Sequence, residues 1–174
     1  MREAVDPARI RSFMQGLGRE VGAEGRVYFT GGASAVLLGW RATTIDVDVK
    51  LIPDSDDLLR PIPRLKETLR INVELASPDQ FIPALSGWAD RSPFIERHGS
   101  VSFFHYDFYA QALAKVERAH ALDVEDVREM VARGLVDPAK ALDFLTAIES
   151  ELYRYPAVDP AAFRRSAERL LRRP

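Results

Sequence analysis

Cysteine is absent from this chain of 174 residues. Without thiols the chain has no disulfide framework and no thiolate-bound zinc or iron–sulfur site. No apolar run approaches the roughly 20 residues that a membrane-spanning helix needs, so we expect no membrane partner. The first residues, MREAVDPARIRSF, lack the apolar stretch of a signal peptide, which favours a cytoplasmic protein.

An excess of positive charge is also missing, because 24 basic residues face 26 acidic ones and the net charge is −2. Generic binding of polyanions by the whole molecule is therefore excluded, and any contact with nucleic acid must use a local patch. Such a patch is present in residues 161–174, where arginine outnumbers acid: Arg164, Arg165, Arg169, Arg172 and Arg173 against Glu168. This segment is a candidate RNA-binding helix, and a solvated helix face is the alternative.

Alternating strands that carry carboxylates next to a glycine turn predict an α/β fold, of the α+β kind, in which a small mixed sheet carries packed helices. Three Asp-Pro pairs, at Asp6, Asp137 and Asp159, mark helix starts, because Asp accepts hydrogen bonds from first-turn amides and Pro suits the first helical position. The expected strands are 26–30, 44–50, 71–75 and a hairpin over 94–105. The expected helices are 7–21, 33–38, 55–60, 64–69, 107–119, 124–133, 138–152 and 160–172.

We expect two regions packed as one compact unit, a core over residues 1–106 and a helical region over 107–174. Residues 77–93, which contain three prolines, are expected to form a long ordered loop of the core.

Acidic residues alternate with apolar ones in the expected strand 44–50. Ile45, Val47 and Val49 are predicted on one face, and Asp46 and Asp48 on the other. Two carboxylates at positions i and i+2 of a strand lie about 6–7 Å apart on one face, close enough to share divalent cations. Taken alone, this pattern is also typical of an ordinary exposed strand face.

The order of the motifs favours a catalytic site over an ordinary exposed strand face. A strand leads into Gly31-Gly32 and a short helix before the Asp-x-Asp strand, and the glycines allow the backbone to approach a phosphate. A later strand carries Glu74 on its polar face. Three carboxylates from two strands are typical of a two-metal phosphoryl-transfer site, in which the third acid activates the nucleophile.

These motifs resemble the polymerase-β-like nucleotidyltransferase superfamily, in Phe29-Thr-Gly-Gly-Ala-Ser34 followed by Asp46-Val-Asp48. More narrowly, the chain resembles the AbiEii and MenT toxin-type nucleotidyltransferases over roughly residues 25–130. That likeness includes Arg41-Ala-Thr-Thr-Ile-Asp-Val-Asp48, Ser77-Pro-Asp-Gln-Phe-Ile-Pro83, Tyr109-Ala-Gln-Ala-Leu-Ala-Lys-Val-Glu-Arg118 and Leu122-Asp-Val-Glu-Asp-Val127.

The resemblance implies a role for each matching residue. Asp46, Asp48 and Glu74 correspond to the metal-binding and catalytic carboxylates, and Gly31, Gly32 and Ser34 to the nucleotide-binding turn. Lys115 corresponds to a helical lysine that contacts the triphosphate, and Asp123 or Asp126 to a downstream catalytic aspartate. The chain departs from the family at its second glycine, where active members commonly carry Ser, and Ser34 is the candidate substitute.

The function implied is Mg²⁺- or Mn²⁺-dependent transfer of a nucleotidyl group from an NTP to an acceptor hydroxyl. The candidate acceptors are RNA, tRNA in particular, a protein and a small molecule. Toxin-type relatives also imply a cognate antitoxin or another protein partner. The alternative is a nucleotidyltransferase-like module that binds or regulates without catalysis.

Several candidate residues also have purely structural interpretations. Lys115 fits a solvated helix edge. Asp123 fits the N-cap of a helix over 124–133, and Asp126 an exposed first-turn acid. His98, His105 and His120 have no metal-ligand spacing and are predicted to be turn, strand and loop residues.

Overall fold

The computed structural model describes residues 3–172, which form two compact units. A sheet unit comprises the residues up to 77 together with 92–106, and a helical unit comprises 78–91 together with the residues from 107 onward. Residues 78–91 thus group with the helices that follow residue 107 rather than with the sheet.

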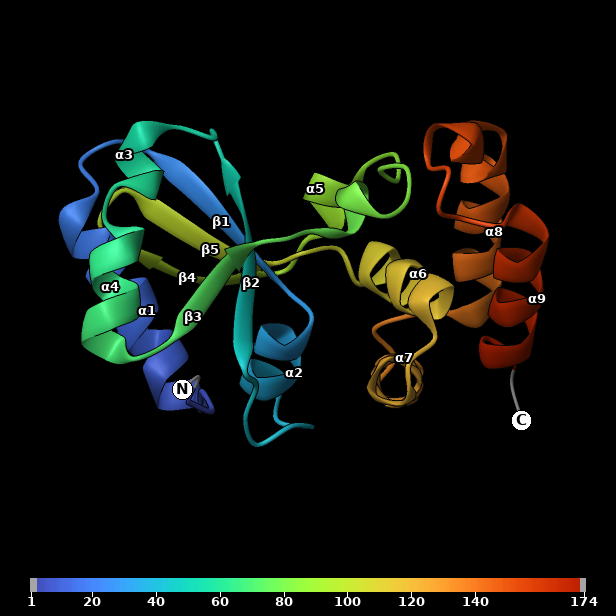
Figure 1. The fold of residues 1–174 in the computed structure, drawn as a ribbon, viewed down its shortest axis with the longest axis horizontal. Helices are drawn as coiled ribbons and strands as arrows, with labels where there is room; N and C mark the ends of the chain where they lie inside the picture. The colour runs from blue at the N-terminus through green and yellow to red at the C-terminus, as the bar shows by residue number, and fades with distance from the viewer. Residues whose placement is uncertain (1–2, 173–174) are drawn as a thin grey trace. The chain divides into compact units, whose positions relative to one another are not determined.

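The sheet unit contains a five-stranded mixed sheet in the order β3-β2-β1-β5-β4 (Figure 1). Its strands are β1 (Gly25–Thr30), β2 (Asp46–Ile52), β3 (Asn72–Leu75), β4 (Phe94–His98) and β5 (Val101–His105). Strand β1 is antiparallel to β2 and parallel to β5, β2 is parallel to β3, and β4 and β5 form the predicted antiparallel hairpin. The α/β prediction is therefore confirmed.

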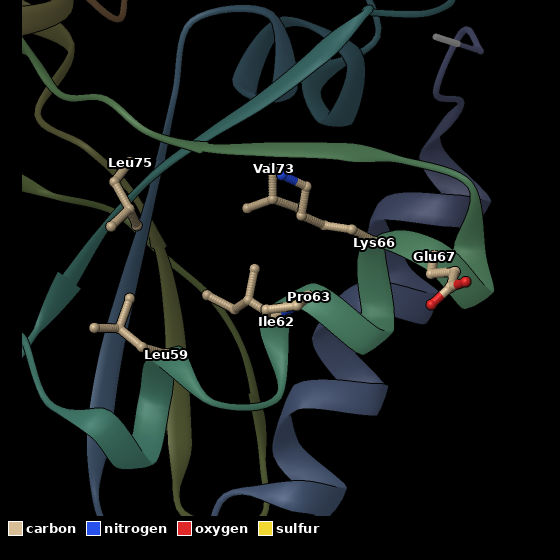
Figure 2. A pocket seen from close by; sticks show the side chains of 7 residues that line it. All are labelled: Leu59, Ile62, Pro63, Lys66, Glu67, Val73 and Leu75. Atoms are coloured by element: carbon tan, nitrogen blue, oxygen red, sulfur yellow. The ribbon is translucent and has the colours of Figure 1, made fainter. Parts of the chain in front are cut away.

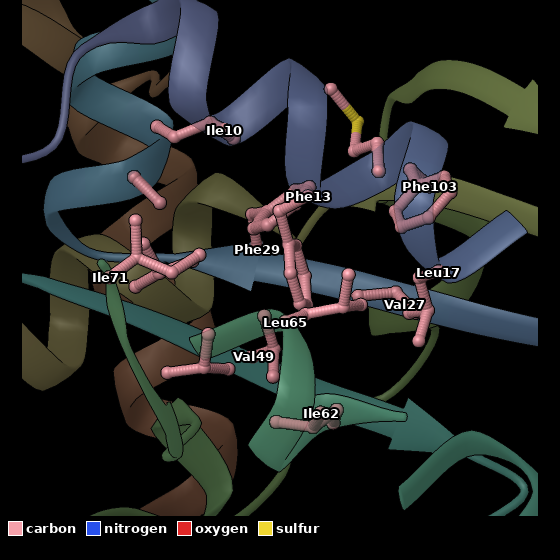
Figure 3. Packing of buried hydrophobic residues seen from close by; sticks show 14 of the residues in the cluster. Ile10, Phe13, Leu17, Val27, Phe29, Val49, Ile62, Leu65, Ile71 and Phe103 are labelled. Carbon is pink, nitrogen blue, oxygen red and sulfur yellow. The ribbon is translucent and has the colours of Figure 1, made fainter. Parts of the chain in front are cut away.

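The helices of the sheet unit are α1 (Pro7–Glu20), α2 (Gly32–Leu38), α3 (Asp56–Leu59) and α4 (Ile62–Leu69). Apolar side chains of α1 and α4 join one face of the sheet in a single buried cluster (Figure 3). At its centre the ring of Phe29 lies 6.3 Å from Phe13 and 6.0 Å from Phe103. Successive side chains of a strand point to opposite faces, so the alternate residues of β1, β2 and β3 lie on the face away from this cluster.

The helical unit contains mainly short helices. They are a 3₁₀ turn (Pro78–Gln80), α5 (Trp88–Arg91), α6 (Phe108–Arg118), α7 (Ala121–Ala132), α8 (Pro138–Ile148), a second 3₁₀ segment (Glu149–Arg154) and α9 (Pro160–Leu170). The predicted helix 138–152 thus ends as an α-helix at Ile148, and the chain continues in the tighter 3₁₀ form. In residues 3–172 no helix is long and apolar enough to span a membrane.

All three Asp-Pro helix starts are confirmed. The carboxylates of Asp6, Asp137 and Asp159 accept hydrogen bonds from the amides three residues later, at 2.9, 3.0 and 3.1 Å. The prolines occupy the first turn, where no hydrogen-bond donor is lost. These starts were predictable because a cap is formed entirely by neighbouring residues.

Two apolar residues are more exposed than the predicted alternation implies. Ile45, expected on the buried face, is 48% exposed, because strand β2 begins only at Asp46. Thr44, which precedes Ile45, forms an isolated bridge with Val5. Leu75 lies on the predicted face but is 49% exposed. Strand β3 is at the edge of the sheet, where packing against a neighbouring strand is available on one side only.

Candidate functional site

Three carboxylates gather on the face of the sheet opposite the apolar cluster. In β2 the half-buried Asp46 and Asp48 alternate with the buried Val47 and Val49. The parallel pairing of β2 with β3 places Asp48 opposite Glu74, and Asp46 opposite Asn72. Because paired residues of neighbouring strands point to the same face, the three acids predicted from the sequence lie together.

The amide of Asn72 links two of these carboxylates. Its Nδ2 donates to Oδ1 of Asp46 at 2.7 Å and to Oε1 of Glu74 at 2.8 Å. A shared donor draws the two oxygens together and offsets part of their repulsion. Asn72 was not among the predicted site residues, although its alternation with Glu74 on one strand face was a signal for it.

The Gly31-Gly32 turn lies beside Asp48. Gly31 has a φ of +63°, a region that L-residues with side chains rarely adopt, and a Cβ added there would lie 3.3 Å from Oδ2 of Asp48. A Cβ on Gly32 would lie 2.8 Å from Cβ of Thr44, so a serine at this position has no room without a shift. The turn therefore brings bare backbone next to a candidate metal ligand.

The hydroxyl of Ser34 points into the protein. Ser34 is fully buried, and its Oγ lies 3.2 Å from the carbonyl oxygen of Phe29 and 2.9 Å from Nδ1 of His105. This arrangement joins the first turn of α2 to the ends of β1 and β5. Within it Ser34 positions the glycine turn, and its side chain is engaged inside the protein.

His105 is the strand histidine of the sequence prediction, and its environment keeps it neutral. Its residue exposure is 6%, and burial lowers the pKa of its imidazole from 6.5 to about 4. At neutral pH the ring is therefore an uncharged partner of Ser34.

Two carboxylates of this face could form part of a Mg²⁺ site that a bound substrate completes. In residues 3–172 no three His, Cys, Asp or Glu side chains are already arranged as a metal-binding group. Mg²⁺ in phosphoryl-transfer sites is commonly held by one or two carboxylates, with substrate phosphates and water completing the shell. Asp46 and Asp48 supply such a pair, and Glu74 lies next to it.

A second cluster of predicted site residues lies within the helical unit. Helix α6 ends at Arg118, and the next residue, Ala119, has a φ of +54° and leads the chain into α7. The ammonium of Lys115 on α6 thereby contacts two acids of α7, Asp126 at 2.7 Å and Asp123 at 3.4 Å. Arg118 adds a contact to Asp123 at 2.8 Å.

The surface and capping positions predicted as alternatives for these three residues are wrong. Lys115 and Asp126 are 5% and 1% exposed, so neither is a solvated surface residue. Helix α7 begins at Ala121 after His120, so Asp123 is not its cap. Burial alone would raise the pKa of Asp123, but the hydrogen bond from Arg118 and the charge of Lys115 outweigh it and hold that pKa below its usual range.

An apolar pocket of about 620 Å³ lies between β3 and the helices α3 and α4 (Figure 2). It is lined by Leu59, Ile62, Pro63, Lys66, Glu67, Val73 and Leu75. Val73 and Leu75 alternate with Asn72 and Glu74 along β3, so the pocket opens on the other face of this strand. It is not part of the carboxylate site.

Comparisons with protein-family models, with curated proteins and with solved structures find no match to this chain. The interpretation of the site therefore depends on the chain's own residues.

We predict that His105 makes the protein sensitive to mild acid. Between pH 6.5 and about pH 4 the unfolded state binds a proton at this imidazole and the native state does not, so stability falls as pH decreases. The expected loss is about 3 kcal/mol across this range. His105→Asn retains a polar group for Ser34 but cannot titrate, and its free energy of unfolding should decrease less between pH 7 and pH 5.

Urea unfolding at a series of pH values checks this expectation. Ser34→Ala is the matched control, because it removes the hydrogen bond and leaves the imidazole in place. This variant should keep the acid sensitivity of the wild type. Equal pH dependence in wild type and His105→Asn would contradict a neutral buried imidazole.

We predict that Lys115 is structurally essential to the helical unit. Lys115→Met removes a buried cation and leaves Asp123 and Asp126 buried without its charge. This substitution should lower the free energy of unfolding by about 3–5 kcal/mol. Arg128→Met, a change at an exposed arginine of α7, is the control and should stay within about 0.5 kcal/mol. Adding Asp126→Asn to Lys115→Met should recover part of the loss. Equal stability of the two single variants in urea unfolding would rule out the buried ion pair.

Proposed function

We propose that this chain is a Mg²⁺-dependent nucleotidyltransferase that moves a nucleotidyl group from an NTP to an acceptor hydroxyl. One observation carries the proposal. Asp46, Asp48 and Glu74, from two parallel strands, share one face of the sheet beside the bare backbone of Gly31 and Gly32. This combination of carboxylates and glycine turn is what metal-assisted phosphoryl transfer requires.

The roles follow from position. Asp46 and Asp48 would hold Mg²⁺, which when bound neutralises charge on the phosphates of the NTP. Glu74 accepts the proton of the attacking hydroxyl. The acceptor oxygen forms a bond to the α-phosphorus while the bond to the departing pyrophosphate breaks. Asn72 positions Asp46 and Glu74 through its two hydrogen bonds.

Lys115, Asp123 and Asp126 lie in the helical unit, and their roles toward NTP stay predictions from the resemblance.

An RNA hydroxyl is the acceptor that the surface favours. On α9, Arg164 is engaged with Glu149 and Thr146, whereas Arg165 and Arg169 are exposed. Arg172, two residues after the helix, is exposed as well. Exposed arginines on one helix are suited to phosphate contacts along an RNA backbone. Arg173 lies outside the described residues.

A second candidate is a nucleotidyltransferase-like module without catalysis. It is favoured by the glycine turn, which has no hydroxyl at its second position, and by Ser34, whose hydroxyl is engaged inside the protein. Such a module would bind NTP or a partner and transfer nothing.

We predict that Asp46→Asn and Asp48→Asn each lower nucleotidyl transfer by at least two orders of magnitude and leave the fold intact. Neutralising one of two close carboxylates relieves repulsion, so the melting temperature should stay the same or rise. The assay combines each labelled NTP, Mg²⁺ and total RNA or cell extract. Asp57→Asn, at an exposed acid of α3, is the control and should transfer like the wild type.

The outcomes separate the two candidate functions. Activity within a few-fold of wild type in either variant would remove the metal roles of Asp46 and Asp48. If the wild type transfers nothing but Mg²⁺-NTP raises its melting temperature, the module without catalysis is supported, because a ligand of the native state stabilises it.

A further inference from the structure

An arginine lies against the second glycine of the turn. A Cβ added to Gly32 would lie 3.4 Å from Nη1 of Arg41, just as one added to Gly31 would lie 3.3 Å from Oδ2 of Asp48. A carboxylate therefore lies near Gly31 and a guanidinium near Gly32. All these residues belong to the sheet unit.

The fold fixes the backbone of Arg41 in this place. The chain leaves α2 through Gly39, whose φ is +90°, and folds back so that the amides of Trp40 and Arg41 donate to the carbonyl of Ala35 at 3.1 and 3.3 Å. Three residues later Thr44 exchanges two backbone hydrogen bonds with Val5, at 2.7 and 3.0 Å. The segment between α2 and β2 is thus anchored at both ends, and Arg41 is partly exposed within it.

A cation at this position would favour binding of an NTP. An NTP is strongly anionic, and Asp46, Asp48 and Glu74 already place three carboxylates on the adjacent sheet face. A metal ion held by Asp48 would supply positive charge next to the glycine turn. The guanidinium of Arg41 would add a planar pair of N–H donors that matches two phosphate oxygens.

We propose that Arg41 is a substrate-binding residue that clamps a phosphate group of the NTP against the Gly31-Gly32 backbone. The inference deepens the proposed function and rests on it. It adds that recognition at this turn is directed to the phosphates and depends on a bidentate arginine.

The test measures dissociation constants of each NTP in the presence of Mg²⁺ by calorimetry. Arg41→Gln should weaken binding of the favoured NTP by about 10- to 100-fold, the loss of one charge-assisted contact. Arg41→Lys keeps the charge without the fork and should recover only part of this affinity. Arg60→Gln, at an exposed arginine of the same unit, is the control and should bind like the wild type.

A second measurement uses the unaltered protein and so does not depend on the folding of a variant. Phenylglyoxal modifies accessible arginines, and peptide mapping reports each position. The favoured NTP with Mg²⁺ should slow modification of Arg41 at least several-fold, and the matching nucleoside, which lacks phosphates, should not. Arg60 should be modified at the same rate in both cases.

The outcomes distinguish this inference from the proposed function. The role of Arg41 alone is overturned if the wild type and Arg41→Gln bind NTP equally well. It is also overturned if NTP does not slow the modification of Arg41. Absence of NTP binding in the wild type overturns both proposals. Weakened binding in Arg41→Gln together with phosphate-dependent protection supports the clamp, whether or not transfer to an acceptor is detected.

Discussion

The parallel pairing of β2 with β3 is the constraint on which the candidate site depends. Its register places Val47 opposite Val73 on the buried face and, as a consequence, Asp48 opposite Glu74 on the other. A slip by one residue would move the carboxylate of Glu74 into the apolar cluster. Burial of the valines therefore holds the acids together despite their mutual repulsion, and Asn72 offsets part of that repulsion through its amide.

Local features of this fold were predictable from sequence, and long-range partnerships were not. The Asp-Pro caps and the alternation of Asp46 and Asp48 depend on neighbouring residues, so the local sequence pattern is sufficient to predict them. The partner of Ser34, His105, is 71 residues away, and the burial of Lys115 depends on how α6 and α7 meet. Ile45 was misplaced because the strand starts one residue after it, and alternation alone does not mark a boundary.

The two units contribute different chemistry, each within its own structure. In the sheet unit Asp48 and Arg41 flank a glycine turn whose backbone is bare, and a neutral Ser34–His105 pair supports the turn from inside. In the helical unit Lys115, Arg118, Asp123 and Asp126 form a compact ion-pair cluster. Lys115, Asp123 and Asp126 are buried in this cluster, so loss of the lysine would leave two buried acids without its charge.

Paramagnetic Mn²⁺ provides the most direct measurement of whether the carboxylate face is a metal and nucleotide site. With a non-hydrolysable NTP analogue present, Mn²⁺ should broaden the backbone amide signals of Gly31, Gly32, Asp46, Asp48 and Glu74 before others, because relaxation falls steeply with distance from the ion. Asp48→Asn should need a much higher Mn²⁺ concentration for the same broadening. Broadening centred on other residues, with these five amides unaffected, would contradict a metal site on the β2–β3 face.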